Sequence, residues 1–218
     1  MTELKAVSLA EVSEGIRNSV KPVSILWQAP DTVAFVARGR AHRSEFHADP
    51  SDEVMYMIKG EMNLHYLTPE GAEKVALVRE GEIIYCPAGV RHSPRFSPDS
   101  FLLVLERKRR ADERDRFFWY CEKCRAELYQ AVRHVADYRE DPVSRVYEEF
   151  YSEESRRTCG KCGHVTTGRR RLLRLAHQSG NQIAGTRENV SGIVEQHRTQ
   201  IVFQEWQADR GKAQLDLI

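Results

Sequence analysis

The sequence predicts a mainly β fold of the jelly-roll type, followed by a small module that contains four cysteines. Between residues 23 and 106 the chain consists of short β-branched or aromatic segments, separated by Gly, Pro and charged turns. Many short strands at roughly even spacing favour a sandwich or barrel. Two Cys-x-x-Cys pairs then follow within residues 117–167. These two observations give the fold class and the order of its two parts.

The helix and strands of the first part can be located individually. Ser8 with Glu11 three positions later is a capping-box start, so we expect a short amphipathic helix over residues 8–19. The expected strands are residues 33–38, 54–58, 62–67, 74–78, 82–86 and 101–106.

The second part begins after a charged stretch. Residues 107–116 are dense in charge and are interpreted as a solvated connector. Residues 127–135 alternate like a strand, and residues 141–151 are expected to form a short helix that begins at Asp141-Pro142.

These expectations divide the chain into four parts. Residues 1–22 form an N-terminal helical segment, residues 23–110 the barrel, and residues 111–167 the linker with the four-cysteine module. Residues 168–218 are a polar, Gln-rich extension whose role the sequence does not predict.

Composition excludes several classes of function. The 218 residues include 33 basic and 32 acidic side chains, a balance that argues against a general nucleic-acid binder. No stretch approaches the roughly 20 apolar residues needed to cross a bilayer, so no membrane association is expected. The first residues lack the apolar region of a secretory signal, and we expect a cytoplasmic protein.

Four of the five cysteines have the spacing of a metal site. The pattern is Cys121-x2-Cys124-x34-Cys159-x2-Cys162, which is typical of a tetrahedral tetrathiolate centre that holds iron or zinc. All four positions are thiolates, so the expected role is structural. Disulfides are a weaker alternative in a reducing compartment. Cys86 stands apart and is expected to be a buried core thiol.

A second set of potential ligands lies within the predicted barrel. His47 and Glu53 flank a loop, and His92 follows a Pro-x-Gly turn. Two imidazoles and one carboxylate are the set that holds ferrous iron on one face and leaves the other face open. An open face is what a catalytic metal needs.

At these residues the sequence resembles a known fold family. Gly81-x5-Pro87-x-Gly89-x2-His92 matches the second motif of the cupins, and the run around His47 and Glu53 is a variant of the first. Glu45 stands where many cupins have another histidine. The resemblance implies a double-stranded β-helix, the cupin jelly roll.

The order of further motifs narrows the resemblance to bacterial and fungal 3-hydroxyanthranilate 3,4-dioxygenases over residues 20–167. The runs that carry it are Arg43-Ser44-Glu45-Phe46-His47-x5-Glu53, Arg91-His92-Ser93-Pro94, Glu106-Arg107 and Trp119-Tyr120-Cys121-x2-Cys124. The resemblance implies that His47, Glu53 and His92 bind catalytic Fe(II), that the partners are a small aromatic substrate and dioxygen, and that the protein is a homodimer.

The resemblance also implies roles for three charged side chains. Arg43 would contact the substrate or oxygen near the iron, the alternative being a surface arginine. Glu106 would bind the ring amine and hydroxyl, the alternative being a salt bridge to a core arginine. Glu45, where the family usually has aspartate, would lie behind the ligands or handle protons, or else face outward.

The substrate side of the pattern departs from the family. The family usually has a second arginine four residues after its last iron histidine, where it binds the substrate carboxylate. Phe96 occupies that place, and Arg95 lies one position earlier. A gap could bring Arg95 into register as a substrate-binding residue, although a one-residue shift in a strand reverses the face that a side chain uses. An expected asparagine is also absent near Val23 and Ser24.

The expected reaction is therefore ring cleavage of 3-hydroxyanthranilate or a close ortho-aminophenol, giving 2-amino-3-carboxymuconate semialdehyde, the precursor of quinolinate. The alternatives are a paralogue with a shifted aromatic substrate and a non-catalytic cupin that senses a ligand. A metal-dependent isomerase or decarboxylase on the same scaffold is a further alternative.

Overall fold

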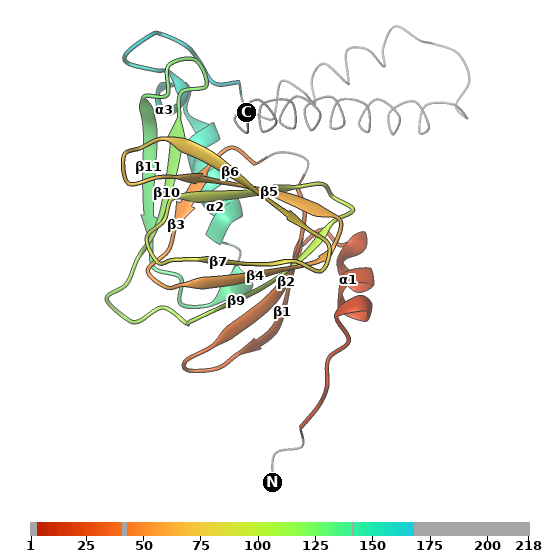
Figure 1. The fold of residues 1–218 in the computed structure, drawn as a ribbon. Coiled ribbons are helices and arrows are strands. Elements are labelled where there is room, and N and C mark those ends of the chain that lie inside the picture. Colours follow the sequence, from red (N-terminus) through yellow and green to blue (C-terminus); the bar gives the residue numbers. More distant parts are fainter. Residues whose placement is uncertain (1–3, 41–42, 141, 168–218) are drawn as a thin grey trace, which may run out of the picture. The chain divides into compact units, whose positions relative to one another are not determined.

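The computed structural model describes residues 4–40, 43–140 and 142–167, which form two antiparallel sheets with helices at their edges and faces (Figure 1). One sheet has the strand order β1-β2-β9-β4-β7 and the other β11-β10-β3-β8-β5-β6. The strands of the first sheet are β1 (Val23–Gln28), β2 (Val33–Arg38), β4 (Glu53–Lys59), β7 (Ile83–Cys86) and β9 (Phe101–Glu106). Those of the second are β3 (Phe46–Ala48), β5 (Glu61–Leu67), β6 (Glu73–Arg79), β8 (His92–Phe96), β10 (Asp115–Tyr120) and β11 (Glu127–Arg133).

The predicted N-terminal helix is present as α1 (Leu9–Arg17). The Ser8 side chain accepts a hydrogen bond from the Glu11 amide, which satisfies one of the unpaired N–H groups of the first turn. Ile16 is buried with Val36 and Phe101, so α1 covers part of the first sheet. The capping signal therefore marked the correct residue.

An apolar core lies between the two sheets. It includes Met55 and Met57 of β4, Met62 and Leu64 of β5 and Val104 of β9, together with Leu102, Val78 and Cys86. The predicted core position of Cys86 is confirmed. Because side chains alternate along a strand, Glu53 shares the core-facing side of β4 with the two methionines. A carboxylate is thereby placed at the end of the apolar interior.

Strands β10 and β11 extend the second sheet beyond the barrel and carry a separate cluster of aromatic residues. Phe117 and Trp119 pack against α2 (Pro142–Ser152), and the rings of Trp119 and Phe150 stack with centroids 4.6 Å apart. A short 3-10 helix η1 (Tyr138–Glu140) precedes α2, and α3 (Glu154–Arg157) follows it. The predicted strand and helix of this region are both confirmed, within two residues at each end.

The interpretation of residues 107–116 as a solvated connector was wrong at two positions. Arg109 is only 5% exposed and Asp115 only 1%, and Asp115 begins β10. Charge density indicates solvent exposure only when the charges lack partners, and these two side chains form an ion pair with each other.

The four-part division of the chain stays a prediction, and residues 168–218 lie outside the described part. The described residues up to His164 form one compact unit. No helix in the described ranges is both long and apolar enough to cross a membrane.

Candidate metal centres

Four potential ligands meet at one end of the apolar interior. His47 of β3, Asp49, Glu53 of β4 and His92 of β8 each present a donor atom, and these atoms all lie within 4.8 Å of one another. Strand pairing explains this, because His47 lies directly opposite His92 in the ladder between β3 and β8. The structure thus brings together the three residues singled out in the sequence and adds Asp49.

Hydrogen bonds orient the ring of His92. Its Nδ1 lies 3.0 Å from the carbonyl oxygen of Val90 and 3.5 Å from Sγ of Cys86. Its Nε2 lies 3.1 Å from Oε2 of Glu53. With Nδ1–H donating to the carbonyl, Nε2 is the nitrogen that faces the other ligands and would bind a cation once its proton has left.

The ring of His47 is held from the other side. Its Nε2 lies 2.8 Å from Oδ2 of Asp115, and the ring of Phe117 stacks on it with centroids 4.6 Å apart. Its Nδ1 lies 3.9 Å from Oδ2 of Asp49, toward the cluster. A carboxylate behind a metal-ligating histidine fixes the orientation and tautomer of the ring, and Asp115 occupies that position.

Burial and mutual charge control the protonation of the cluster. Burial favours the neutral form of Glu53, but His92 and His47 outweigh it and lower the pKa of the Glu53 carboxyl. Burial lowers the pKa of His92, and Glu53 outweighs that effect and raises it. Burial and the Glu53 charge raise the pKa of Asp49 to about 10. Two buried carboxylates side by side repel each other unless a proton or a cation separates them.

These donors fit a divalent cation. Oδ2 of Asp49 is buried and lies 3.9 Å both from Nδ1 of His47 and from Nη2 of Arg109, and its carboxyl also interacts with that of Glu53. Two imidazoles and two carboxylates gathered in the interior suit a bound cation, which would balance the two negative charges. Asp49 was missed in the sequence, where its place two residues after His47 was the only signal.

Replacing Asp49 with asparagine is expected to change how the stability of the metal-free protein depends on pH. The folded-state pKa of about 10 lies above the ordinary value of 3.8, so the folded protein keeps a proton that the unfolded chain releases. The stability from this group is present below pH 3.8 and is lost as pH rises toward 10. The slope for one proton is at most about 1.4 kcal/mol per pH unit.

Thermal unfolding between pH 5 and 8 measures this difference. In the metal-free proteins, Tm is expected to fall more steeply with rising pH in the parent than in Asp49→Asn, whose amide stays neutral. Mn²⁺ is expected to flatten the slope of the parent because a cation favours the carboxylate. Equal slopes without metal would contradict the burial of an ionisable Asp49.

A buried arginine connects the cluster to Glu106. Nε and Nη2 of Arg109 donate to the two carboxylate oxygens of Asp115 at 2.6 and 2.9 Å. Its Nη1 donates to Oε2 of Glu106 at 2.8 Å. Glu106 in turn lies opposite Glu53 in the ladder between β9 and β4. Glu106 therefore pairs with a buried arginine, which belongs to the stretch interpreted as a connector, and the contact of Glu106 with the substrate stays a prediction.

Glu106 nevertheless stays easy to protonate. Burial and the charge of Glu53 raise its pKa to about 7, against the opposing effect of Arg109. A carboxyl with a pKa near neutrality can accept and return a proton at physiological pH.

Arg43 and Glu45 form a second polar group with α2. Nε of Arg43 donates to Oε1 of Glu45 at 2.7 Å, and the hydroxyl of Tyr147 donates to Oε2. Glu45 is fully buried, so the alternative of an outward-facing Glu45 is wrong. Arg43 and Tyr147 both donate to the Glu45 carboxylate, which fixes the orientation of the Arg43 guanidinium.

The structure does not bring Arg95 to the cluster. Side chains alternate along β8, so His92 and Phe96 share one face and Arg95 takes the other. Phe96 packs against the core cluster between the sheets. Arg95 donates to the Ser93 hydroxyl and lies 3.9 Å from the Glu73 carboxylate. Arg95 stands one position before the place where the family has an arginine, and this difference of one residue puts its side chain on the opposite face of β8.

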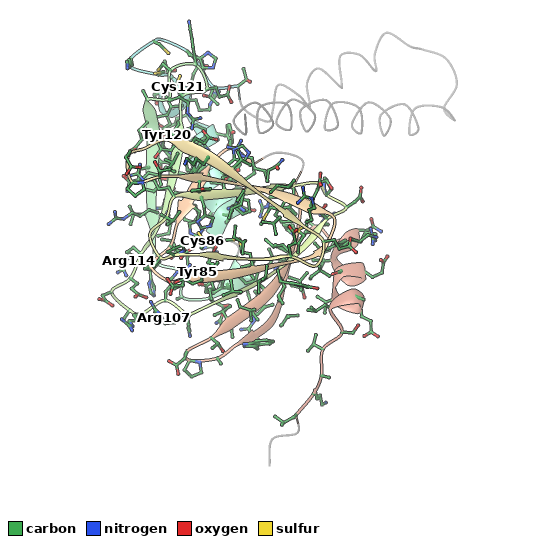
Figure 2. All side chains as sticks on the ribbon, in the orientation of Figure 1. Tyr85, Cys86, Arg107, Arg114, Tyr120 and Cys121 are labelled. Carbon is green, nitrogen blue, oxygen red and sulfur yellow. The ribbon has the colours of Figure 1, made fainter. Side chains whose placement is uncertain are left out.

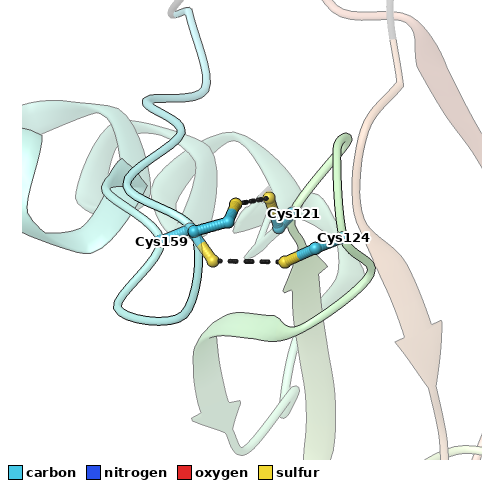
Figure 3. A group of neighbouring side chains, drawn as sticks. Cys121, Cys124 and Cys159 are labelled. Carbon is cyan, nitrogen blue, oxygen red and sulfur yellow. Dashed lines mark hydrogen bonds between the residues drawn. The ribbon is translucent and has the colours of Figure 1, made fainter.

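The four paired cysteines converge on a second candidate centre (Figure 3). Sγ of Cys121 lies 3.6 Å from that of Cys162, and Sγ of Cys124 lies 3.5 Å from that of Cys159. A disulfide needs about 2.05 Å, so the disulfide alternative is wrong and the thiols are free. Four sulfurs at these separations suit a tetrahedral metal ion.

Both Cys-x-x-Cys turns have the same backbone pattern. The amide of Arg125 donates to the Cys121 carbonyl, and the amide of Gly163 donates to the Cys159 carbonyl. Both donors have positive φ, 60° and 68° respectively. A non-glycine residue rarely adopts this conformation, so its presence at Arg125 shows how strongly the turn is constrained.

The two candidate centres are well separated. Tyr120 and Cys121 lie at one end of the molecule in Figure 2, away from Cys86 of β7, which touches His92. Each centre can therefore be emptied or altered without touching the ligands of the other.

A Cys159→Ser variant is expected to lose the metal of the four-cysteine centre and to loosen residues 121–164. Structural metal sites stabilise their modules directly, because the site does not exist in the unfolded chain. Metal content should fall by one equivalent per chain, and limited proteolysis should cut this segment first. Lys161→Ser, at the exposed position between Cys159 and Cys162, is the control and should behave like the parent. Unchanged metal content in Cys159→Ser would contradict a four-cysteine centre.

The comparisons with known proteins agree with this geometry. The model of a family described as 3-hydroxyanthranilic acid dioxygenase matches residues 1–151. The chain belongs to that family. It is 37% identical over 141 residues to a 3-hydroxyanthranilate 3,4-dioxygenase of Bacillus cereus, covering 65% of this chain and 78% of the relative. It is 33% identical over 173 residues to one of Jannaschia, covering 78% and 95%.

A solved structure of a cupin-2 domain containing protein from Shewanella frigidimarina is 16% identical, with a TM-score of 0.37, over 46% of this chain and 94% of that one. The predicted family is confirmed by the family match, and the predicted mainly β architecture with a four-cysteine cluster is confirmed by the two antiparallel sheets and the converging cysteines. The chain is a ring-cleaving dioxygenase by family membership.

Proposed function

We propose that this dioxygenase requires non-heme Fe(II) and opens the ring of 3-hydroxyanthranilate or a close ortho-aminophenol. With 3-hydroxyanthranilate the product would be 2-amino-3-carboxymuconate semialdehyde, the precursor of quinolinate. The observation that carries the proposal is the meeting of His47, Glu53 and His92 at the end of the barrel, within the family match.

His47, Glu53 and His92 are proposed to hold the iron, with Asp49 beside them. Bound there, ferrous iron would supply adjacent coordination positions for the aminophenol and dioxygen, and a path for electrons between them. The protein's part is to keep the donors aligned, through Val90 and Glu53 for His92 and through Asp115 for His47.

Glu106 is proposed to bind the ring amine and hydroxyl and to accept the phenolic proton. It lies opposite Glu53, so a ring held at the metal would present these groups to it. Its pKa of about 7 suits proton exchange near neutrality. Arg43 is proposed to contact the substrate or oxygen, with Glu45 holding its guanidinium in one orientation.

The position of Arg95 supports a second candidate within the same class, a paralogue with a shifted aromatic substrate. Arg95 lies on the face of β8 opposite that of His92, a position that favours a substrate with different ring substituents over the carboxylate contact that a one-residue gap would have allowed. A ligand-sensing cupin without turnover is the further alternative, against which the complete ligand set argues.

The remaining proposals concern the surroundings of the reaction. We propose iron or zinc in the four-cysteine centre, a homodimer, and a cytoplasmic location. The substrate is proposed to be a small aromatic molecule, with no nucleic acid and no membrane as partner. The division into segments 1–22, 23–110, 111–167 and 168–218 is kept as a proposal.

Oxygen uptake by the Fe(II)-reconstituted protein with 3-hydroxyanthranilate tests the proposed reaction. We expect one equivalent of oxygen consumed per substrate, with the semialdehyde formed, and a large loss of rate in Arg43→Ala. Uptake with 2-aminophenol but not with 3-hydroxyanthranilate would favour the shifted paralogue. Turnover without oxygen would indicate an isomerase or decarboxylase, and metal binding without any turnover would indicate a ligand-sensing protein.

A further inference from the structure

Two tyrosines of α2 hold the segment that leads into β3. The hydroxyl of Tyr147 accepts a hydrogen bond from the amide of Ser44 at 2.9 Å. The hydroxyl of Tyr151 lies 3.1 Å from Oγ of Ser44, which also accepts a hydrogen bond from Nε1 of Trp119 at 3.1 Å. Ser44 directly follows Arg43 in the chain. The helix therefore fixes the backbone beside Arg43.

The Tyr147 hydroxyl also binds a side chain of this segment. It donates to Oε2 of Glu45, and Nε of Arg43 donates to Oε1 of the same carboxylate at 2.7 Å. Glu45 is fully buried, whereas the side chain of Arg43 is 18% exposed. Burial and the nearby Glu45 carboxylate raise the pKa of the Tyr147 phenol, so it stays protonated and remains a donor at neutral pH. A continuous chain of hydrogen bonds therefore runs from α2 to the Arg43 guanidinium.

Tyr147 lies on the face of the second sheet that also carries a candidate metal ligand. Because side chains alternate along β10, Phe117 and Trp119 share one face of this strand. The ring of Phe117 stacks on that of His47 with centroids 4.6 Å apart. The ring of Trp119 meets that of Tyr147 edge to face, with centroids 5.7 Å apart. The aromatic side chains that flank His47 therefore also support Tyr147.

We propose that Tyr147 is a positioning residue of this enzyme, which orients the Arg43 guanidinium through the Glu45 carboxylate. The inference rests on the proposed function, in which Arg43 contacts the substrate or dioxygen. Because an arginine side chain has high rotamer entropy, a bond to a mobile carboxylate would leave the guanidinium free to turn. With its second oxygen bonded to Tyr147, the Glu45 carboxylate is fixed, and Arg43 presents its remaining donors in one direction.

A double-mutant cycle in the Fe(II)-loaded enzyme tests the proposal. In the parent, Tyr147→Phe is expected to lower kcat/KM for 3-hydroxyanthranilate about tenfold, as for the loss of one hydrogen bond to a charged group. In Arg43→Ala, whose residual rate is measured at high enzyme concentration, the same substitution should change kcat/KM by less than about twofold, because no guanidinium is left to orient. A purely structural role of the phenol would lower the rate by the same factor in both backgrounds.

A second readout follows Arg43 itself and needs no activity. Phenylglyoxal reacts with accessible guanidinium groups, and its reaction at Arg43 can be followed by peptide mass spectrometry. The rate at Arg43 is expected to rise several-fold in Tyr147→Phe, because the guanidinium spends more time away from Glu45. Tyr129→Phe is the matched control, since it removes a phenol that donates to Glu149 on the same helix. Its kcat/KM and its modification rate at Arg43 should equal those of the parent.

The failure of this inference can be told apart from the failure of the proposed function. If the parent consumes oxygen with 3-hydroxyanthranilate but Tyr147→Phe is as active as the parent, or loses activity equally in both backgrounds, the inference is wrong and the function stands. An unchanged modification rate at Arg43 in Tyr147→Phe would overturn the inference whatever the activity. If the parent shows no activity with iron bound, the proposed function fails, and the modification rate still decides whether Tyr147 orients Arg43.

Discussion

Replacing His92 with alanine is expected to remove the metal from the four-ligand cluster and to reduce oxygen uptake below detection. His92 presents Nε2 to Glu53 at 3.1 Å, and its other nitrogen is fixed by the Val90 carbonyl. Removing a residue that only hydrogen-bonds to a metal ligand typically lowers metal affinity or activity about 10- to 100-fold. Removing the ligand itself should lower them further.

Metal analysis can follow the two centres separately. Mn²⁺, which prefers oxygen and imidazole donors over thiolates, reports on the cluster, while the iron or zinc retained by the purified protein reports on the cysteines. His92→Ala should lose Mn²⁺ binding and keep the thiolate-bound metal.

His134→Ala is the matched control, because His134 is exposed and its ring lies against the backbone oxygen of Glu113, in a loop outside the cluster. It should bind Mn²⁺ and consume oxygen like the parent. If His92→Ala retained both properties, the cluster would not be the catalytic metal site.

The parts of the site that were predictable from the sequence are those encoded by short spacings. The Pro-x-Gly turn before His92 and the run from His47 to Glu53 each fix the local backbone. In the structure, His92 begins β8, His47 lies in β3 and Glu53 begins β4. The Cys-x-x-Cys turns are equally local, and their backbone bonds close within five residues. Such patterns carry their own structure, so they can be interpreted without knowing the fold.

The parts that were missed depend on contacts between distant residues. Asp115 lies 68 positions from His47, and only the pairing of β10 with β3 brings them together. The burial of Arg109 could not be predicted from composition, because a sequence rich in charged residues is the same whether its side chains are solvated or paired. Short strands such as β3 and β10 were also not anticipated, since three to six residues carry little periodicity of their own.

The uncertainty at Arg95 has a different physical origin. Alignment to a family pattern allows a one-residue gap, but a strand does not, since the shift exchanges its two faces. The structure resolves the register through the pairing of β8 with β5, in which Asn63 lies opposite Arg95 and Met62 opposite Phe96. Family resemblance therefore predicted which candidate ligands meet better than it predicted where Arg95 lies.

Replacing Arg109 with methionine is expected to have the largest effect on stability and to weaken metal binding as well. The guanidinium is 5% exposed and joins Asp115, Glu106 and Ser51 through hydrogen bonds of 2.6 to 2.9 Å. Methionine fills a similar volume but leaves two buried carboxylates without their partner. Breaking one side of a buried ion pair typically costs about 3–5 kcal/mol.

The same variant should act on the metal through Asp115. Without its two bonds from Arg109, Asp115 no longer holds the His47 ring in one orientation, so affinity for Mn²⁺ should fall by about 10- to 100-fold. Arg109→Lys keeps the charge but not the planar pair of donors, and an intermediate loss is expected. Denaturant unfolding and Mn²⁺ titration measure the two effects independently.

Arg107→Met provides the comparison that decides between a specific and a general effect of charge. Arg107 pairs with Glu113 in a more exposed setting, where such a pair is worth at most about 1 kcal/mol. Arg107 stands two residues from Arg109, and its replacement by methionine removes the same charge. The difference in unfolding free energy between the two methionine variants therefore measures the effect of burying the ion pair. Equal unfolding free energies and equal Mn²⁺ affinities in the two methionine variants would contradict a connecting role for Arg109. A large loss confined to Arg109→Met would show that the stretch once interpreted as a solvated connector supports the metal centre.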